Sequence, residues 1–499
     1  MKYNFIKTDN VIESIFDINS TTLDELNKEY DFTILDEVVS SFKNILDQNK
    51  DKKFLIVGDY DCDGICATTI IKKLFMYLNI NSNFYIPSRI KDGYGLNIDI
   101  VDVAIKNNFD VLFLVDNGIT CNETIDYANN NGLKVFIIDH HEYDTLPKAE
   151  AIIHSNLVND KYKNLSAGGL SLLLALQYYY DEQSIILGGL TTLSDVMPVY
   201  GFNRYLIKTT LELLNNNKYY QIYLLNDRNK FDYVSLSYVV IPKINAISRM
   251  EPLANPNHLV EFLLSNKKAS DEHIESINYV NEQRKTLSKK MTSEAYSLIN
   301  DKDIIVVASK NFSEGLCGLV ANRLVYSLKK PVICLAYIDG MYKGSGRSID
   351  GFNFYDALKD YNHFDSFGGH EGAVGLSIKE KDYESFIKYV NSVSYNTQDS
   401  IQDVLLIDEE LISFKLLEEL KKLEPFGQGF VKPLIAIKNN NFKKIVVSNR
   451  FPKYIINNNL SAISFDEKHL NIIPEYLIGN IQKDNYYNNS LQLIIEDLV

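Results

Sequence analysis

A short apolar run that ends in three closely spaced aspartates is the strongest constraint on the fold of this chain. The run Phe-Leu-Ile-Val at 54–57 is followed by Gly58 and then by Asp59, Asp61 and Asp63. Its length and composition are typical of a strand buried on both faces of a parallel sheet. Gly64 allows a tight turn into residues 65–71, an amphipathic segment that we predict to be helical. The aspartates are therefore expected at the carboxyl edge of the sheet, where α/β proteins bind their ligands.

Three carboxylates this close together need a cation. Without one they repel each other, and partial burial raises their pKa values. A bound divalent metal ion is the usual physical reason for such a cluster. The alternative, an acidic surface turn or a helix N-cap, accounts for one aspartate well and for three poorly. The residues thus favour a metal site.

The same arrangement, an apolar run that leads to acidic or imidazole side chains, recurs along the chain. Runs at 111–115 and 135–138 and a helix-like stretch at 188–198 present, in order, Asp116, then Asp139, His140 and His141, and then Asp195. Any one of these residues fits a cap or a turn, and a single histidine is more often a core residue than a ligand. Four instances of one pattern indicate an α/β domain that gathers ligands at one edge.

Composition limits the class of protein. A chain of 499 residues with 45% hydrophobic residues is long enough for about three domains. The net charge of −14 argues against coating nucleic acid over the whole surface but allows a local basic groove. Five scattered cysteines without zinc spacing predict reduced thiols. The absence of a long apolar run and of a signal peptide predicts a cytoplasmic protein with no membrane association.

The second half of the chain predicts three further parts. Apolar residues at helical spacing over 270–300 indicate a long amphipathic helix, which we interpret as a connector between domains. A smaller α/β unit follows from residue 303, and short strand-like runs from about residue 401 suggest a small barrel. Within that barrel, a mixture of charge and aromatic rings suits single-strand binding, although a solvated hairpin face explains it nearly as well: Phe442, Lys443, Lys444, Arg450, Phe451, Lys453 and Tyr454.

Several side chains outside the acidic motifs are suited to phosphate. Arg89 and Tyr94 lie on a predicted glycine-bearing loop at 88–96, where they can hold a phosphate and stack a base, but a plain solvated loop fits as well. The glycine-rich stretches at 344–348 and 367–370 carry Ser345, Arg347, Gly369 and His370. Glycine lets backbone amides approach phosphate, and Arg and His add charged donors. Tight turns alone leave the Arg and His without a reason.

The motifs together resemble a known family. Gly58–Gly64 (GDYDCDG), Asp116–Gly118 (DNG), Asp139–His141 (DHH) and Ser194–Asp195 (SD) are similar to the four ordered motifs of the DHH phosphoesterase superfamily. Spelling and spacing resemble most its single-strand-specific 5′→3′ exonuclease branch. The similarity continues downstream at 242–249, 281–285, 344–348, 367–370 and 425–427. At 247–248, Ile-Ser replaces the Ala-Gly pair expected of that branch.

The resemblance implies a fold and its division into domains. It implies a DHH catalytic domain with a parallel sheet and N-terminal helices over 1–265, and a long connector helix over 266–300. A smaller α/β DHH-associated domain that binds substrate would follow over 301–400, and an OB-like β-barrel that binds nucleic acid over 401–499.

The resemblance also implies a two-metal site. Two Mn²⁺ or Mg²⁺ ions would be held by Asp59, Asp61, Asp63, Asp116, His140 and Asp195, with Asp116 as the bridge. Asp139 and His141 would support these ligands or face the substrate, which gives a catalytic set of Asp116, Asp139, His140 and His141. Asn245 and Arg249 match positions near the substrate backbone, and Ser345, Arg347, Arg89 and Arg249 would grip the 5′ end of the strand.

The activity implied by the resemblance is metal-dependent 5′→3′ hydrolysis of single-stranded DNA to 5′-mononucleotides, in DNA repair and recombination. Expected partners are single-stranded DNA, a single-strand-binding protein and a helicase, and the expected state is a monomer. Two alternatives stay open. One is a DHH phosphodiesterase for short oligoribonucleotides or cyclic dinucleotides, and the other is a catalytically inactive DNA-binding scaffold.

Overall fold

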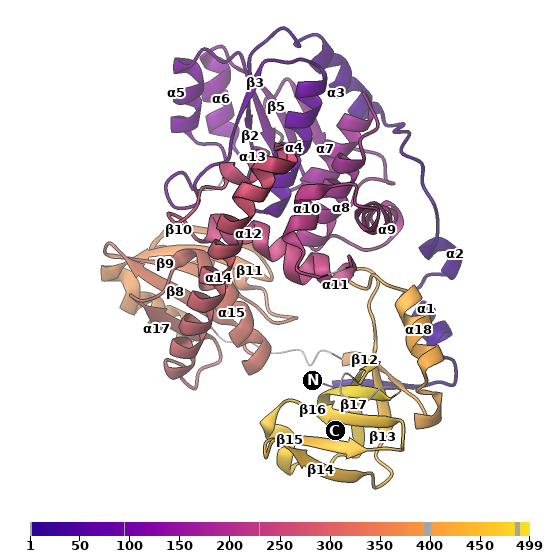
Figure 1. Ribbon diagram of the computed structural model, residues 1–499. Coiled ribbons are helices and arrows are strands. Elements are labelled where there is room, and N and C mark those ends of the chain that lie inside the picture. Colours follow the sequence, from indigo (N-terminus) through magenta and orange to yellow (C-terminus); the bar gives the residue numbers. More distant parts are fainter. Residues whose placement is uncertain (1, 94, 229, 394–400, 485–489) are drawn as a thin grey trace. The chain divides into compact units, whose positions relative to one another are not determined.

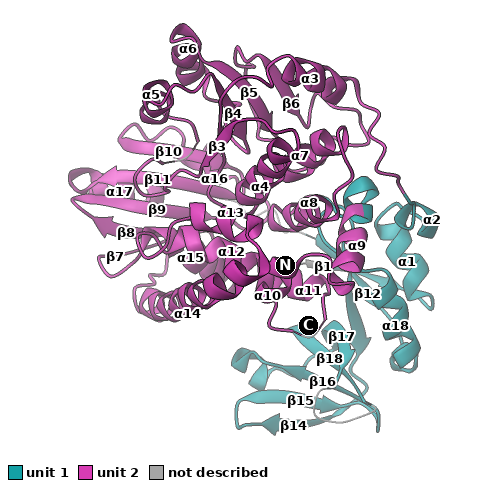
Figure 2. Cartoon of the chain, turned by 45° about the horizontal axis from the view of Figure 1, so that its top comes forward, with its two compact units in different colours: residues 1–29, 198–205, 399–499 teal, residues 30–197, 206–398 magenta. Residues whose placement is uncertain are grey.

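The computed structural model describes residues 2–93, 95–228, 230–393, 401–484 and 490–499. The chain divides into two compact units, which Figure 2 distinguishes by colour. Unit 1 contains residues 1–29, 198–205 and 399–499, and unit 2 contains residues 30–197 and 206–398. No helix in the described ranges is both long and apolar enough to cross a membrane.

A parallel five-stranded sheet forms the first half of unit 2. Its order is β3 (Ser82–Tyr85), β2 (Phe54–Val57), β4 (Val111–Val115), β5 (Lys134–Asp139) and β6 (Ala151–His154). Strands β2 and β4 are buried along their whole length, as their continuous apolar sequences predict. The prediction of a buried parallel sheet is confirmed.

Helices cover both faces of this sheet (Figure 1). On one face, side chains such as Leu55 and Leu112 pack against α5 (Ile98–Lys106) and α6 (Asn122–Asn130). On the other face, a cluster of phenylalanines joins the sheet to α3 (Glu37–Asp47) and α4 (Cys62–Tyr77): Phe42, Phe54, Phe75, Phe113 and Phe136. Helix α4 also packs on α7 (Ala167–Leu176) and α8 (Glu182–Ser194).

A helical segment follows and leads to the second half of unit 2. Its helices are α9 (Gly201–Asn215), α10 (Tyr220–Leu225), α11 (Tyr233–Ser235), a π-helical turn (Leu236–Val240), α12 (Ile241–Arg249), α13 (Asn257–Leu264) and α14 (Lys267–Ser297). The 31-residue helix α14 is the long helix predicted over 270–300. It packs against α12 and against α15 (Glu314–Leu328).

The second sheet of unit 2 has the order β10 (Phe364–His370), β11 (Ala373–Lys379), β9 (Met341–Arg347), β8 (Val332–Ile338) and β7 (Ile305–Ser309). Helices α14 and α15 cover one face, and α16 (Phe354–Leu358) and α17 (Tyr383–Ser392) pack on the other. Both glycine-rich stretches, 344–348 and 367–370, lie largely in strands of this sheet rather than in turns.

Unit 1 is built on an eight-stranded sheet that includes the N-terminal residues. Its order is β1 (Lys2–Lys7), β12 (Ile401–Leu406), β13 (Leu434–Lys438), β17 (Tyr476–Lys483), β18 (Leu491–Leu498), β16 (Leu460–Ser464), β15 (Phe451–Ile455) and β14 (Lys443–Val447). Helices α1 (Val11–Ile18), α2 (Leu23–Leu26) and α18 (Phe414–Lys422) belong to the same unit.

This arrangement differs from the division expected from the sequence, in which residues 1–265 formed one domain. Strand β1 pairs in parallel with β12, about 400 positions further along, so residues 1–29 cluster with the C-terminal part. Residues 198–205 also belong to unit 1, because the fully buried guanidinium of Arg204 donates to the carbonyls of Leu26, Leu423 and Pro425 at 3.1, 2.7 and 2.8 Å. No local sequence pattern predicts either the pairing of β1 with β12 or the hydrogen bonds of Arg204.

Candidate active site

The first acidic motif is shaped by the start of α4, directly after β2. Asp61 is the N-cap of this helix, and its Oδ1 accepts hydrogen bonds from the backbone N–H groups of Asp63 (2.9 Å) and Gly64 (3.2 Å). A Cβ on Gly64 would lie 2.5 Å from backbone atoms of Asp59, so the turn requires glycine. The turn therefore folds the three aspartates of the motif close to one another.

Asp63 is held by a second helix. Its carboxylate is buried and accepts the backbone N–H groups of Ala167 (2.9 Å) and Gly168 (2.7 Å) at the start of α7. The positive end of a helix dipole stabilises a carboxylate at this position. Because both contacts are made by backbone, Asp63 is oriented before any ligand binds.

Asp116 leaves β4 in a left-handed conformation, with φ at +63°. Such a conformation costs free energy for a residue with a Cβ and is concentrated at functional sites. The carboxylate itself is buried. The backbone strain thus accompanies a side chain that is placed at the carboxyl edge of the sheet, next to the residues that follow β5.

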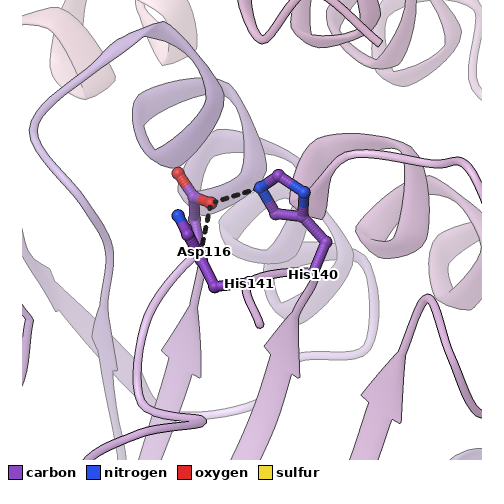
Figure 3. Close-up of side chains that lie close together, drawn as sticks. All are labelled: Asp116, His140 and His141. Atoms are coloured by element: carbon purple, nitrogen blue, oxygen red, sulfur yellow. Dashed lines mark ion pairs between the residues drawn. The ribbon is translucent and has the colours of Figure 1, made fainter. Parts of the chain in front are cut away.

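His140 faces the aspartates. Its Nε2 lies 3.2 Å from Oδ2 of Asp195, 3.4 Å from Oδ1 of Asp116 and 3.6 Å from Oδ2 of Asp63. Burial, together with the charge of neighbouring His141, lowers the pKa of His140 to about 4, so the ring is neutral at pH 7. Figure 3 shows one oxygen of the Asp116 carboxylate directed toward both the His140 and the His141 ring.

Asp139 binds His141 rather than joining the ligand cluster. Its Oδ1 lies 2.7 Å from Nδ1 of His141 and accepts the N–H of His140 at 2.7 Å, while its Oδ2 accepts the N–H of Ile119 at 3.0 Å. Burial alone would lower the pKa of His141, but the hydrogen bond and charge of Asp139 outweigh it and raise that pKa to about 9. Asp139 therefore orients His141 and favours its protonated form.

The cluster carries more negative charge than its burial tolerates. Burial first, and neighbouring carboxylates second, raise the pKa values of Asp59, Asp63 and Asp116 well above the usual range and that of Asp195 to about 6. Among the described residues, the buried Oδ1 of Asp59 and Nε2 of His140 find no hydrogen-bond partner. Divalent cations would neutralise the excess negative charge of the carboxylates, and they would accept the lone pairs of the two atoms that lack a hydrogen bond.

Potential ligand atoms form three overlapping groups, each within 4.8 Å. The groups are Asp59, Asp61 and Asp116; Asp63, His140 and Asp195; and Asp116, His140 and His141. Mostly oxygen ligands suit Mn²⁺ or Mg²⁺. The geometry therefore fits two neighbouring ions, with Asp116 shared between groups, and it brings together all six residues expected as ligands. His141 also falls in one of these groups, whereas the resemblance implied that it supports the ligands or faces the substrate.

Three arginines of unit 2 form a second constellation. Arg89 follows β3, Arg249 ends α12 and Arg347 ends β9, and within the described residues none of them pairs with a carboxylate. Burial, then Arg89, Arg284 and Arg347, lower the pKa of Arg249 to about 10, and burial and Arg89 also lower that of Arg347. Like charges that are partly buried and have no carboxylate partner indicate an anion site.

Two glycines of α15, which the sequence did not single out, make room for this cluster. A Cβ on Gly315 would lie 2.4 Å from the carbonyl oxygen of Arg249, and one on Gly318 would lie 2.8 Å from the guanidinium of Arg347. The start of α15 therefore contacts both the end of α12 and the arginine at the end of β9. The signal in the sequence was the Glu314–Gly318 spacing, which reads equally well as an ordinary helix start.

The remaining grip residues lie on the same face of the second sheet. The register places His370 of β10 opposite Ala373 of β11, and Ala373 opposite Arg347 of β9. Two strand spacings therefore separate the backbone of His370 from that of Arg347, a distance of about 10 Å. Ser345 is buried near Gly318, and His370 is exposed. Gly369 has φ +137°, and a Cβ there would lie 2.2 Å from the Ala373 carbonyl oxygen. Tyr94 lies outside the described residues.

Asn245 of α12 contacts the metal motif directly. Its Oδ1 accepts the backbone N–H of Cys62, between Asp61 and Asp63, at 2.8 Å. We expect Asn245→Ala to raise the Mn²⁺ concentration needed for half-maximal activity by about 10- to 100-fold, because groups that orient metal ligands contribute affinity of this order. A Mn²⁺ titration of the hydrolysis of single-stranded DNA, the activity that the resemblance implies, measures the change.

Asn245→Asp is the matched control for this prediction, because aspartate keeps an oxygen that can accept the same N–H. It should require less Mn²⁺ than the alanine variant. An alanine variant with a wild-type Mn²⁺ titration would show that the contact does not orient the motif.

Three of the basic and aromatic residues expected to bind single strands in the C-terminal part are used within unit 1, while Lys443 and Arg450 are exposed. Tyr454 is buried, Lys444 donates to the carbonyls of Leu470 and Ile472, and Lys453 lies 3.6 Å from Asp484. An aromatic pair also remains, in which the ring centroid of the half-buried Phe451 lies 5.6 Å from that of the exposed Phe465.

Comparison with known families agrees with this order of parts. The model of the DHH family N-terminal domain matches residues 53–192, the DHHA1 domain matches 301–395, and the RecJ OB domain matches 405–497. The chain is 28% identical to the single-stranded-DNA-specific exonuclease RecJ of Bacillus subtilis, over 92% of this chain and 63% of the relative. It is also 28% identical to the Escherichia coli protein of that name, over 77% of this chain and 74% of the relative.

Solved structures give the same answer for the fold. The RecJ of Thermus thermophilus in complex with Mn²⁺ matches with a TM-score of 0.85 at 20% identity, covering all of this chain and 79% of that one. An exonuclease RecJ bound to manganese matches with a TM-score of 0.64 at 25% identity, covering 73% of this chain and 95% of that one. The chain spans about three fifths to three quarters of the curated relatives' lengths.

A parallel sheet with this acidic edge, followed by a DHHA1 domain, defines the class of the DHH phosphoesterases. The third matched domain is the one that carries the RecJ name. The chain is thus similar, part by part and in the same order, to the RecJ proteins of the DHH superfamily.

Proposed function

We propose that this chain is a metal-dependent 5′→3′ exonuclease that hydrolyses single-stranded DNA to 5′-mononucleotides, in DNA repair and recombination. One observation carries the proposal. In unit 2 the candidate cation site and the candidate anion site are neighbours, because the guanidinium of Arg89 lies 5.3 Å from the ring centre of Tyr60, the residue between Asp59 and Asp61. In a DNA strand, the phosphodiester to be cleaved would lie at the cation site, and the terminal phosphate would bind at the anion site.

The acidic cluster would provide the hydrolytic centre. Asp59, Asp61, Asp63, Asp116, His140 and Asp195 would hold two Mn²⁺ or Mg²⁺ ions, which supply water activation and charge neutralisation at the phosphodiester. His141, held protonated by Asp139, would donate to a phosphate oxygen. No covalent nucleophile is needed.

The arginine cluster would set polarity and product size. Arg89, Arg249 and Arg347, with Ser345, would bind the 5′-phosphate, and Asn245, Gly369 and His370 would border the path of the strand. A fixed distance between a terminal-phosphate site and the hydrolytic centre releases one nucleotide per cleavage. The 5′ end is therefore the one from which digestion would proceed.

The names of the relatives support a single-stranded DNA substrate, as does the RecJ OB domain match at 405–497. Small oligoribonucleotides or cyclic dinucleotides need no such domain, and a binding scaffold needs no complete ligand set. A single-strand-binding protein and a helicase as partners, a monomeric state and a cytoplasmic location remain proposals.

Digestion of a long single strand that is labelled at either end tests the proposal. With Mn²⁺ or Mg²⁺, a 5′ label should appear at once as mononucleotide, and a 3′ label should move through progressively shorter strands. Chelator should stop both. Release of the 3′ label first, internal fragments, or full activity in chelator would contradict the proposal.

Arg347→Gln is expected to reduce the preference for a 5′-phosphate over a 5′-hydroxyl strand by about 10- to 100-fold, because a charge-assisted phosphate contact contributes about 1.5–3 kcal/mol. The ratio of kcat/KM for the two strands measures it. Arg323→Gln removes an exposed arginine of α15 that donates to Thr292, and it should leave the ratio unchanged. An unchanged ratio in Arg347→Gln would remove this residue from the grip.

A further inference from the structure

The loop that carries Arg89 is held at several points. Asn257 of α13 binds both backbone groups of Ile86, accepting its N–H at 2.8 Å and donating to its carbonyl at 3.0 Å. Asp92 accepts the N–H of Ser88 at 2.7 Å and the hydroxyl of Tyr85 at 2.5 Å. These contacts fix the two ends of the loop but leave the position of Arg89 itself open.

Glu251 contacts the loop on both sides of Arg89. Its Oε2 accepts the hydroxyl of Ser88 at 2.6 Å and, over a longer distance of 3.4 Å, the N–H of Ile90. Glu251 lies two residues beyond Arg249, the last residue of α12. One carboxylate thus joins the backbone around Arg89 to the segment that carries Arg249.

Arg89 depends on this backbone contact because its side chain has no acidic partner. Within the described residues, no carboxylate lies within ion-pair distance of its guanidinium, which is 5.3 Å from the centre of the Tyr60 ring. An arginine held only by its backbone and an aromatic ring loses conformational freedom when it binds phosphate. Fixing its backbone in advance reduces that loss.

We propose that Glu251 is a positioning residue that sets Arg89 at the correct distance from Arg249, so that both guanidinium groups reach one 5′-phosphate. The proposal rests on the proposed function. It assigns to Glu251 no contact with substrate, and it accounts for a carboxylate placed beside an arginine cluster without pairing with any of its members. The other oxygen, Oε1, is buried and makes no hydrogen bond, so the loop contacts use a single oxygen.

The test variants are chosen to keep or remove the hydrogen bonds that Oε2 of Glu251 accepts. Glu251→Gln keeps an oxygen that can accept both bonds, whereas Glu251→Ala removes them. Ser88→Ala removes the shorter bond from the loop side. Glu261→Ala is the charge-matched control, because Glu261 is an exposed carboxylate on the adjacent helix α13. Arg89→Ala alone and together with Glu251→Ala completes a double-mutant cycle.

Steady-state digestion of 5′-phosphate and 5′-hydroxyl strands gives the readout. Glu251→Ala and Ser88→Ala should raise KM for the 5′-phosphate strand by about 5- to 20-fold, with kcat within about twofold and the 5′-hydroxyl strand unaffected. Glu251→Gln and Glu261→Ala should resemble the wild type. In the Arg89→Ala background, Glu251→Ala should add less than about a twofold effect.

Equal losses on both strands, a Glu251→Gln variant as weak as Glu251→Ala, or full additivity with Arg89→Ala would overturn the role of Glu251. Failure of the proposed function gives a different result, since the wild type would then show no preference for a 5′-phosphate and Arg89→Ala would change nothing. Ser88→Ala keeps the test decisive if Glu251→Ala does not fold.

Discussion

Asp116→Asn should lower Mn²⁺-dependent release of mononucleotides by about 10³-fold or more, while single-strand binding stays within about twofold of the wild type. Asp116 belongs to two of the three groups of ligand atoms, so its loss affects both candidate cation positions. Each factor of ten in rate corresponds to about 1.4 kcal/mol, and a cation at a phosphodiester contributes several kcal/mol. Single-turnover release of a 5′-labelled nucleotide measures the rate.

Asparagine is the appropriate replacement because Asp116 has φ +63°. Asparagine tolerates this left-handed conformation, whereas alanine strains it, so Asp116→Ala should also lose activity but with some loss of stability. Asp144→Asn is the matched control, since Asp144 is an exposed carboxylate on the loop after His141. Near wild-type release by Asp116→Asn, with an unaffected Asp144→Asn, would refute the metal assignment.

The sequence predicts the candidate metal site at the carboxyl edge of the parallel sheet well, because most of its ligands follow directly after a strand. Phe54–Val57 and Val111–Val115 are buried strands, and the side chains after them meet at one edge of a parallel sheet. A local pattern, an apolar run and then an acid, is enough to place these residues, because parallel topology brings the carboxyl ends together.

Long-range contacts leave no comparable pattern. Strand β1 pairs with β12 through backbone bonds, and Arg204 binds backbone carbonyls far away in the chain. A backbone group has the same chemistry in every residue, so the sequence does not specify which one a side chain will contact. The assignment of residues 1–29 to the C-terminal unit could therefore not be predicted.

The same reason explains which parts of the site the sequence missed. Asn245 was expected near the substrate, yet its Oδ1 binds the N–H of Cys62. Asp63 is oriented by two N–H groups of α7, and Glu251 accepts hydrogen bonds from Ser88 and Ile90 on either side of Arg89. Residues that bind ligands are recognisable by type and spacing, whereas residues that orient them through backbone are recognisable only in the structure.

Removal of divalent metal should abolish activity and make the chain less stable as pH rises from about 6.5 to 8.5. The folded state raises the pKa values of Asp59, Asp63 and Asp116 well above those of the unfolded chain, and it raises that of His141 to about 9. A raised pKa means that the folded state holds more protons, so its stability falls as pH rises. Thermal unfolding in chelator at pH 6.5, 7.5 and 8.5 measures this slope.

The choice of pH window separates this effect from an opposing one. The pKa of His140 is lowered to about 4, so this residue favours folding as pH rises towards its unfolded value near 6.5 and contributes nothing above it. Above that pH, the raised pKa of His141, about 9, makes the folded state less stable as pH rises, and any carboxylate that still holds a proton there acts in the same direction.

Added Mn²⁺ replaces the protons with a cation, and this should reverse the trend. At about 100 times its Kd, an ion that binds only the folded state stabilises it by about 2.7 kcal/mol, and the gain should increase with pH because ligands no longer need to lose protons. Asp116→Asn, which removes one buried charge and a shared ligand, should show a shallower slope in chelator and a smaller shift with Mn²⁺. A wild-type chain whose unfolding temperature in chelator rises between pH 6.5 and 8.5, and does not respond to Mn²⁺, would mean that these carboxylates are not an unneutralised cation site.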